Sequence, residues 1–227
     1  MAGAIVRRFI QILISLLIQA AILFVSSGRL DWIMAWVYVG VYACTVLFNA
    51  LILLPRNPDI IAERGQVKEG TKGWDRLLAG AVSFYGPMLT LIVSGLDLRF
   101  AWSLHPAPTL HLAALPVMVM GYGLFSWAMA SNKFFAGVVR IQKERGHTVA
   151  TGGPYRYVRH PGYVGLTAIQ AATPFLLGSL WALIPAGLTI CLLFVRTALE
   201  DRTLQAELEG YKEYVAQVRY RLLPGIW

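Results

Sequence analysis

The chain has 227 residues, of which 57% are hydrophobic and only 14% charged. An average soluble domain is about half apolar and about a quarter charged, so this composition indicates a membrane protein and excludes a disordered chain. Two cysteines, Cys44 and Cys191, lie in apolar runs and are too few for a disulfide scaffold.

Four uncharged runs in the first part of the chain are long enough to span a membrane. A hydrocarbon core of about 30 Å needs about 20 helical residues. The runs are Phe9–Ser27, Trp32–Pro55, Leu77–Leu96 and Leu112–Ser131. The first follows Arg7 and Arg8, as a signal peptide would, but no small-x-small cleavage site follows it. We therefore expect it to be kept as a span.

A fifth run, Tyr163–Val195, has 33 residues without a charge. As one helix it would be about 50 Å long, which exceeds the bilayer core. Gly178 and Ser179 lie at its middle, where a turn is favourable, and Pro174 and Pro185 flank them. The run predicts a tight helical hairpin, with a single broken helix as the alternative.

The basic residues predict the orientation of the spans. With the N-terminus in the cytoplasm, 18 lysines and arginines fall on cytoplasmic segments and 2 on external ones. Short loops of membrane proteins show this bias. The net charge of +8 is therefore a topology signal. Binding of nucleic acid is not expected, because no soluble basic face is available.

No charge lies in the middle of the first four spans, and no inverted repeat is visible, which argues against a transporter. Two long cytoplasmic segments remain as places for chemistry. The first, Lys133–Tyr163, combines a Gly152-Gly153-Pro154 turn with tyrosines, arginines and two histidines. An interfacial belt would explain the tyrosines and arginines but does not favour the histidines.

The second segment starts at Arg196. Arg196 and Glu200 are four residues apart and share a helix face, either as an exposed ion pair or as functional groups at the membrane rim. The spacing of the apolar residues that follow predicts an amphipathic helix, ended by Pro224, that lies on the membrane or on the protein. These apolar residues are Leu204, Leu208, Tyr211, Val215 and Val218.

The stretch from Gly153 to Tyr163, the apolar hairpin, Glu200-Asp201 and Tyr211–Tyr214 together resemble the isoprenylcysteine carboxyl methyltransferase family. Related bacterial and phospholipid methyltransferases share this pattern. The resemblance covers Asn132–Trp227. It implies an all-α, polytopic membrane bundle of four spans and a C-terminal hairpin, with a cytoplasmic cofactor pocket. Residues 1–131 would form the spans and 132–227 the cofactor-binding core of one integrated domain.

The resemblance also implies S-adenosyl-L-methionine as cofactor, and no metal. The residues that match the family's cofactor site are Gln142, His147, Thr148, Val149, Ala150, Tyr155, His160, Pro161, Gly162, Tyr163 and Glu200. Arg196 matches a substrate-facing arginine. The family often has Glu-Glu where this chain has Glu200-Asp201, so Asp201 receives less weight. Gly121-Tyr122-Gly123 loosely fits a cofactor motif of phospholipid methyltransferases, although close helix packing explains such glycines equally well.

These residue types suit the expected chemistry. Glu200 would pair with the cofactor ammonium, while His160, Gln142 and residues 147–150 would hold its carboxylate and ribose. Tyr155 and Tyr163 would stack on adenine or face the sulfonium. Arg196 would hold an acceptor carboxylate in a bidentate fork. Because His160 lies on a polar loop, its removal is expected to abolish activity without unfolding the protein.

The expected acceptor is a lipophilic or lipidated molecule, most consistent with a prenylcysteine-type carboxylate, that enters sideways from the membrane lipids. Alternatives are a phospholipid amine N-methyltransferase, a membrane NADPH-dependent reductase and a non-enzymatic transporter or scaffold. The expected location is a bacterial inner membrane with the active site facing the cytoplasm. The sequence leaves the oligomeric state open.

Overall fold

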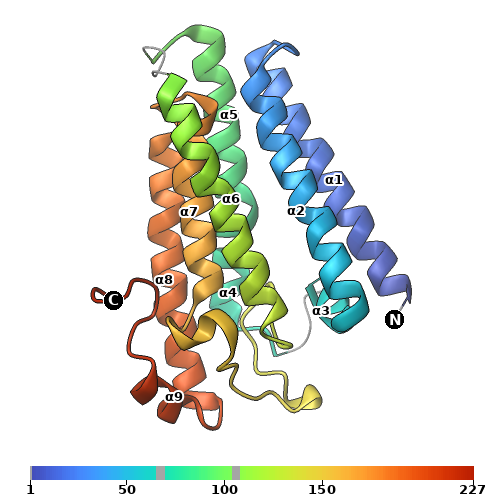
Figure 1. The fold of residues 1–227 in the computed structure, drawn as a ribbon, viewed down its shortest axis with the longest axis vertical. Coiled ribbons are helices and arrows are strands. Elements are labelled where there is room, and N and C mark those ends of the chain that lie inside the picture. The colour runs from blue at the N-terminus through green and yellow to red at the C-terminus, as the bar shows by residue number, and fades with distance from the viewer. Residues whose placement is uncertain (1, 65–69, 104–107) are drawn as a thin grey trace.

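The computed structural model describes residues 2–64, 70–103 and 108–227, and within these ranges the chain is helical without strands (Figure 1). Lys68, counted above among the basic residues, lies outside the described ranges. In chain order the elements are α1 (Ala2–Ser27), α2 (Ile33–Arg56), α3 (Pro58–Arg64), α4 (Gly73–Gly80), η1 (Ala81–Tyr85), α5 (Gly86–Phe100), α6 (Pro108–Ala130), η2 (Lys143–Arg145), η3 (Gly153–Arg156), α7 (Pro161–Leu177), α8 (Leu183–Glu207) and α9 (Tyr211–Gln217).

Five helices among the described residues are long and apolar enough to cross a membrane. They cover Ile5–Ser27, Ile33–Pro55, Gly73–Phe100, Pro108–Ala130 and Leu183–Glu207. Four of them correspond to the four predicted spans to within a few residues at each end, and the fifth includes the second arm of the predicted hairpin. The third begins at Gly73 rather than near Leu77 and runs through η1, a π-helical turn, into α5. The polytopic all-α class is therefore confirmed.

The fifth uncharged run forms the predicted hairpin and not one broken helix. α7 ends at Leu177, and Gly178 adopts a left-handed conformation with φ of 75°. Glycine takes this conformation without the steric cost that a Cβ would impose. Ser179 Oγ then donates to Asp97 Oδ2 at 2.5 Å and accepts from the Ala182 amide at 3.1 Å. The turn is thereby fixed against the end of α5.

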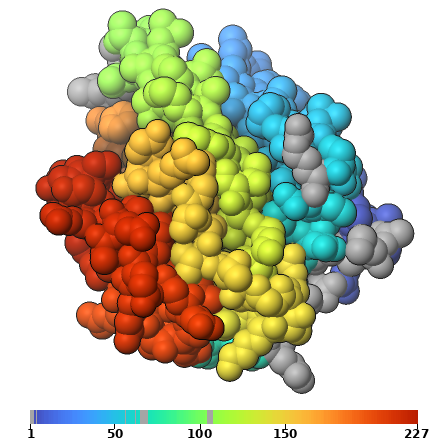
Figure 2. Space-filling model, turned by 60° about the horizontal axis from the view of Figure 1, so that its bottom comes forward, coloured from blue at the N-terminus to red at the C-terminus, as the bar shows by residue number. Residues whose placement is uncertain are grey.

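The basic connections lie at one end of the bundle, as the charge count predicts. Figure 1 places the N-terminus, α3, α4, the loop between α6 and α7, and α9 at that end. In the view of that end, the C-terminal segment, the loop after α6 and the α2–α3 region lie side by side (Figure 2). That this end faces the cytoplasm stays a prediction.

Helices α6 and α7 pack closely because two glycines face each other. A Cβ on Gly165 would lie 2.6 Å from the backbone oxygen of Gly121, and a Cβ on Gly121 would lie 2.9 Å from the Gly165 oxygen. A Cβ on Gly123 would meet nothing within 4 Å. Gly121 therefore serves helix packing. Neither Gly121 nor Gly123 lines the main cavity described below.

The predicted continuous amphipathic helix at the C-terminus is wrong. α8 ends at Glu207, and Gly210, with φ of 78°, separates it from the short α9, which ends at Gln217 and not at Pro224. A left-handed glycine interrupts the helix although the apolar spacing continues. The apolar side chains pack onto the protein, where Leu208, Tyr211 and Tyr214 are buried in a cluster with Tyr155.

Candidate active site

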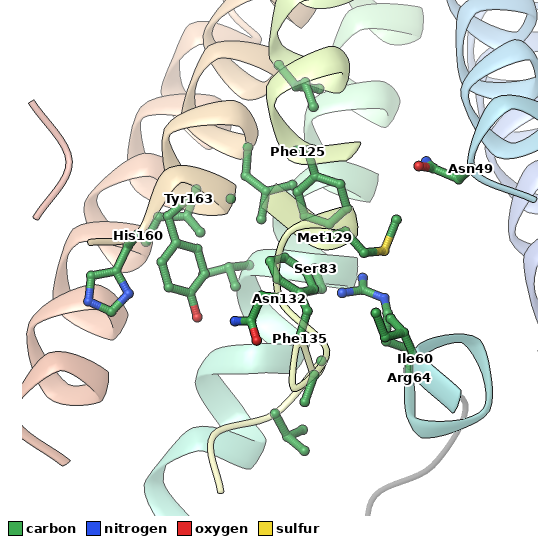
Figure 3. Close-up of a pocket in the computed structure, with 18 of the residues that line it drawn as sticks. Asn49, Ile60, Arg64, Ser83, Phe125, Met129, Asn132, Phe135, His160 and Tyr163 are labelled. Carbon is green, nitrogen blue, oxygen red and sulfur yellow. The ribbon is translucent and has the colours of Figure 1, made fainter. Parts of the chain in front are cut away.

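A cavity of about 620 Å³ opens between the α1–α2 pair and the rest of the bundle. Its volume lies in the range of small-molecule sites, about 300–1,000 Å³. Side chains of α1, α2, α3, η1, α6, α7 and α8 line it, together with the loop after α6. The π-turn η1 contributes Ser83, and Asn49, Arg64 and Tyr163 reach it from α2, α3 and α7 (Figure 3).

Most of the predicted site residues meet at this cavity, although they come from separate segments. The ones that line it are His147, Thr148, Val149, Ala150, Tyr155, His160, Gly162, Tyr163, Arg196 and Glu200. Gln142 and Pro161 do not. The Gln142 amide donates from Nε2 to the Phe134 oxygen at 2.7 Å, and its Oε1 accepts from Arg145 at 2.5 Å. Its contacts fix the loop.

Glu200 and Arg196 have different partners in the structure. The Tyr163 hydroxyl donates to Glu200 Oε2 at 2.5 Å. Arg196 donates from Nε and Nη2 to the two carboxylate oxygens of the fully buried Asp75, at 2.7 and 3.1 Å, and its guanidinium lies 5.4 Å from the Tyr163 ring centroid. The exposed Arg196–Glu200 ion pair considered from the sequence is therefore not formed.

The 147–150 segment places a neutral imidazole on the cavity wall. The backbone amide of Gln142 donates to His147 Nδ1 at 3.2 Å, and the centroid of the His147 ring lies 4.4 Å from that of Phe134. Burial, together with the positive charges of Arg140 and Arg145, lowers the pKa of His147 to about 4. His147 is consequently uncharged at neutral pH, with Nδ1 as an acceptor.

Tyr155 forms the floor of this region. Asn132 Nδ2 donates to the Tyr155 hydroxyl at 3.3 Å, and the Tyr214 hydroxyl donates to the Tyr155 backbone oxygen at 2.7 Å. Burial raises the pKa of the Tyr155 phenol well above its usual range. The phenol therefore stays protonated and offers a donor to a ligand in the cavity.

Asp201, which received little weight from the sequence, holds the C-terminal segments together. It is fully buried and accepts from Arg159 Nε and Nη2 at 2.8 and 3.0 Å, from Arg221 Nε at 2.9 Å and from the Tyr211 hydroxyl at 3.0 Å. These bonds join the loop, α8, α9 and the C-terminal tail. Asp201 is a structural residue in this arrangement.

His160 belongs to the same network, so the expectation that it lies on a polar loop whose change leaves the fold intact is not supported. It is 6% exposed, its Nε2 lies 3.2 Å from Asp201 Oδ1, and its backbone amide donates to the Arg221 oxygen at 3.0 Å. The C-terminal tail covers the histidine, which the local sequence could not reveal. Replacing His160 is therefore expected to affect folding as well as any ligand.

Sequence reasoning missed several cavity residues from the first part of the chain. Arg64 entered only in the count of basic residues and Asn132 only as the start of the resemblance, while Asp75, which holds Arg196 from outside the cavity lining, did not enter at all. Glu63, next to Arg64, accepts from Arg140 Nε at 3.0 Å in a buried ion pair. The one signal available was the Glu63-Arg64 pair directly before a loop, which does not identify a site by itself.

Comparison with known proteins finds similarity to proteins whose names describe a methyltransferase. Residues 112–206 match the model of the isoprenylcysteine carboxyl methyltransferase family. The chain is 27% identical over 145 residues to the protein-S-isoprenylcysteine O-methyltransferase of Schizosaccharomyces pombe, across 63% of this chain and 59% of the relative. It is 27% identical over 144 residues to the protein of the same name from Dictyostelium discoideum, across 61% of this chain and 60% of the relative.

The chain therefore spans about three fifths of the length of the two curated relatives. The family match covers α6, α7 and most of α8, together with the loop that carries His147, Tyr155 and His160. The five apolar helices make the protein an integral, multi-pass membrane protein. Over residues 112–206, the chain is similar to the isoprenylcysteine carboxyl methyltransferase family.

Proposed function

We propose that the protein is an S-adenosyl-L-methionine-dependent methyltransferase that acts on the carboxylate of a lipophilic, prenylcysteine-type acceptor. The observation that carries the proposal is the meeting of Glu200, Tyr163, Tyr155 and the 147–150 segment in one cavity between apolar helices. The family match over residues 112–206 and the names of the two relatives give further support.

The chemistry of the cavity fits this cofactor, which carries a sulfonium and an ammonium. Glu200 is the one carboxylate among the described residues that line the cavity. Tyr155 and Tyr163 add aromatic rings, which attract cations. His147 is neutral and adds no opposing charge at neutral pH. Glu200 would therefore pair with the ammonium, and the tyrosines would face the sulfonium or the adenine.

When bound, S-adenosyl-L-methionine supplies a methyl group on positively charged sulfur, which an acceptor oxygen takes by in-line displacement while the electron pair of the broken S–C bond stays on sulfur. The residues of this chain then need only position the acceptor and exclude water. No proton transfer is required when the acceptor is a carboxylate. The Asp75–Arg196–Tyr163–Glu200 chain of contacts fixes the side chains that would do this.

Calorimetric titration of the full chain in detergent would test the proposal. The wild-type protein is expected to bind S-adenosyl-L-methionine and S-adenosylhomocysteine but not NADPH. Glu200→Gln keeps the size of the side chain and a partner for Tyr163, yet should weaken cofactor binding about 10- to 100-fold, since a charge-assisted bond is lost. Glu209→Gln removes an exposed carboxylate outside the cavity and is the matched control.

The acceptor is tested separately by transfer of a labelled methyl group. We expect methylation of N-acetyl-S-farnesylcysteine and none of phosphatidylethanolamine. Methylation of the amine alone would instead support a phospholipid N-methyltransferase. Binding of NADPH without S-adenosylhomocysteine would overturn the proposal in favour of a reductase, and binding of neither would exclude both enzymes.

A further inference from the structure

Four of the arginines that line the cavity, three of them buried and Arg64 half-buried, differ in whether they have an anionic partner. Arg140 pairs with Glu63, Arg159 with Asp201 and Arg196 with Asp75. These three arginine residues are at most 6% exposed. Arg64, at the end of α3, also lines the cavity, but it forms no ion pair with any residue that the structure describes.

Aromatic rings surround Arg64 in place of an anion. Its guanidinium carbon lies 5.3 Å from the Phe125 ring centroid and 5.1 Å from that of Phe135. Burial, together with the positive charges of Arg8 and Arg196, lowers the pKa of Arg64 to about 10. Arg64 thus stays charged at neutral pH, in surroundings that disfavour its charge. A desolvated cation of this kind is costly until an anion binds it.

The fold holds Arg64 in this position. Ile60 and Ile61 of α3 are buried against Leu53 and Met129, and the neighbouring Glu63 is tied to Arg140 of the loop after α6. Figure 3 shows the Arg64 side chain entering the pocket from the side opposite His160 and Tyr163, with Phe135 and Asn132 between them. The cavity therefore has Glu200 and Tyr163 toward one wall and an unpaired cation toward the other.

Arg196 is less able to bind an acceptor carboxylate. Its Nε and Nη2 already donate to Asp75, and Nη2 also donates to the Gly137 oxygen at 2.9 Å. The bidentate edge that the sequence assigned to the acceptor is occupied by the protein itself. No carboxylate of the described residues occupies the corresponding edge of the Arg64 guanidinium. Such an edge binds a carboxylate through two parallel hydrogen bonds.

We propose that Arg64 binds the carboxylate of the methyl acceptor and gives the cavity its preference for an anionic head group. The inference rests on the proposed function and adds to it a residue from outside the stretch that matches the family. A carboxylate neutralises Arg64, whereas its methyl ester is uncharged and holds the guanidinium less strongly. Arg64 therefore favours binding of the acid and release of the ester.

The test compares two probes that differ only in charge. N-acetyl-S-farnesylcysteine and its carboxamide are titrated against the full chain in phosphatidylcholine nanodiscs. The wild-type protein should bind the acid about 10- to 100-fold more tightly than the amide, as expected for a charge-assisted pair. Arg64→Gln should reduce this ratio to about 1, because binding of the acid becomes weaker while binding of the amide is unchanged. Arg64→Lys should restore part of the ratio.

The control is Arg202→Gln, because Arg202 is an exposed arginine of α8 that does not line the cavity. This variant should keep the wild-type ratio. Arg64→Gln should also melt no lower than the wild type, because no described carboxylate loses its partner. An acid-to-amide ratio that is unchanged in Arg64→Gln, or that is near 1 in the wild type, would overturn the proposal.

Two further readings separate this inference from the proposed function. Binding of S-adenosylhomocysteine should be unchanged in Arg64→Gln. Failure of the wild type to bind S-adenosylhomocysteine would refute the proposed function, while the ratio of acid to amide would still decide the role of Arg64. A last comparison replaces phosphatidylcholine by phosphatidylglycerol in the nanodiscs. If this anionic lipid removes the preference for the acid, and Arg64→Gln has no effect on that preference, the preference belongs to the lipid surface and the inference is contradicted.

Discussion

The N-terminal and C-terminal halves of the molecule differ in whether the arginines that line the cavity have partners of opposite charge among the described residues. In the C-terminal half, α8, α9, the loop after α6 and the tail are joined through one buried carboxylate, Asp201, and its ring of donors. The N-terminal pair α1–α2 packs mainly through apolar contacts and exposes large apolar side chains such as Leu17, Leu47 and Leu51. The short helix α3, which follows this pair, carries Arg64 into the cavity. Arg64 has no carboxylate partner there among the described residues.

This difference indicates a division of labour. Buried ion pairs require exact partners, so removing one member leaves an uncompensated charge and is strongly destabilising. Such a network suits a half that, under the proposed function, would hold a polar cofactor in one geometry. The family match falls on this half. The apolar pair closes the cavity against lipid, and Arg64 of α3, which has no carboxylate partner among the described residues, is available to a ligand.

The largest expected effect comes from breaking the Asp201 network. Asp201→Asn leaves Arg159 buried without a full counter-charge, so we expect a loss of about 3–5 kcal/mol in the free energy of unfolding. Thermal unfolding in detergent measures it as a drop of roughly 10 °C or more. Glu209→Gln, at an exposed position, should leave the melting temperature unchanged. Equal melting temperatures for Asp201→Asn and Glu209→Gln would contradict the structural role of Asp201.

A medium effect is expected at the contact of α6 with α7. Gly165→Ala places a Cβ against the Gly121 backbone oxygen, which cannot rotate away, so the helices must separate at a cost of about 1–3 kcal/mol. Gly123→Ala has open space and should be neutral or stabilising by up to about 1 kcal/mol. The same melting assay compares the two. If Gly123→Ala were the more damaging variant, the assignment of Gly121 to packing would be wrong.

The smallest effect is a pH dependence from His147. Its pKa is about 4 in the folded protein against 6.5 for the free side chain. Between these values the unfolded chain binds a proton that the folded chain does not, so stability falls as the pH drops from 6.5 toward 4. Above 6.5 this contribution is constant.

Melting temperatures at pH 7.5 and 5.0 should therefore differ more for the wild type than for His147→Asn. The asparagine keeps an acceptor for the Gln142 amide but does not titrate. The same decrease for both proteins would assign the pH dependence to other groups, and an increase in stability at pH 5.0 would contradict the neutral state of His147.

Much of the fold follows from local pattern. Uncharged runs of about 20 residues have few alternatives to a membrane helix, because every backbone group must be satisfied internally. The hairpin was predictable from the length of the fifth run and from Gly178. The end of the C-terminal helix was not, since Leu208, Tyr211 and Val215 continue the helical spacing across Gly210. The spacing of apolar residues indicates which side chains face the core. A left-handed glycine can interrupt the helix while that spacing continues.

The candidate site divides in the same way. The sequence by itself determined the membrane class, the number of spans and, through the motif from Gly153 to Tyr163, the stretch that lines one side of the cavity. Only the tertiary structure decided that Arg196 pairs with Asp75, that His160 is buried beneath the tail, and that Arg64 enters the cavity. The physical reason is that the partner of a buried charge is chosen by proximity in space, and Asp75 and Arg196 are separated by 121 positions in the chain.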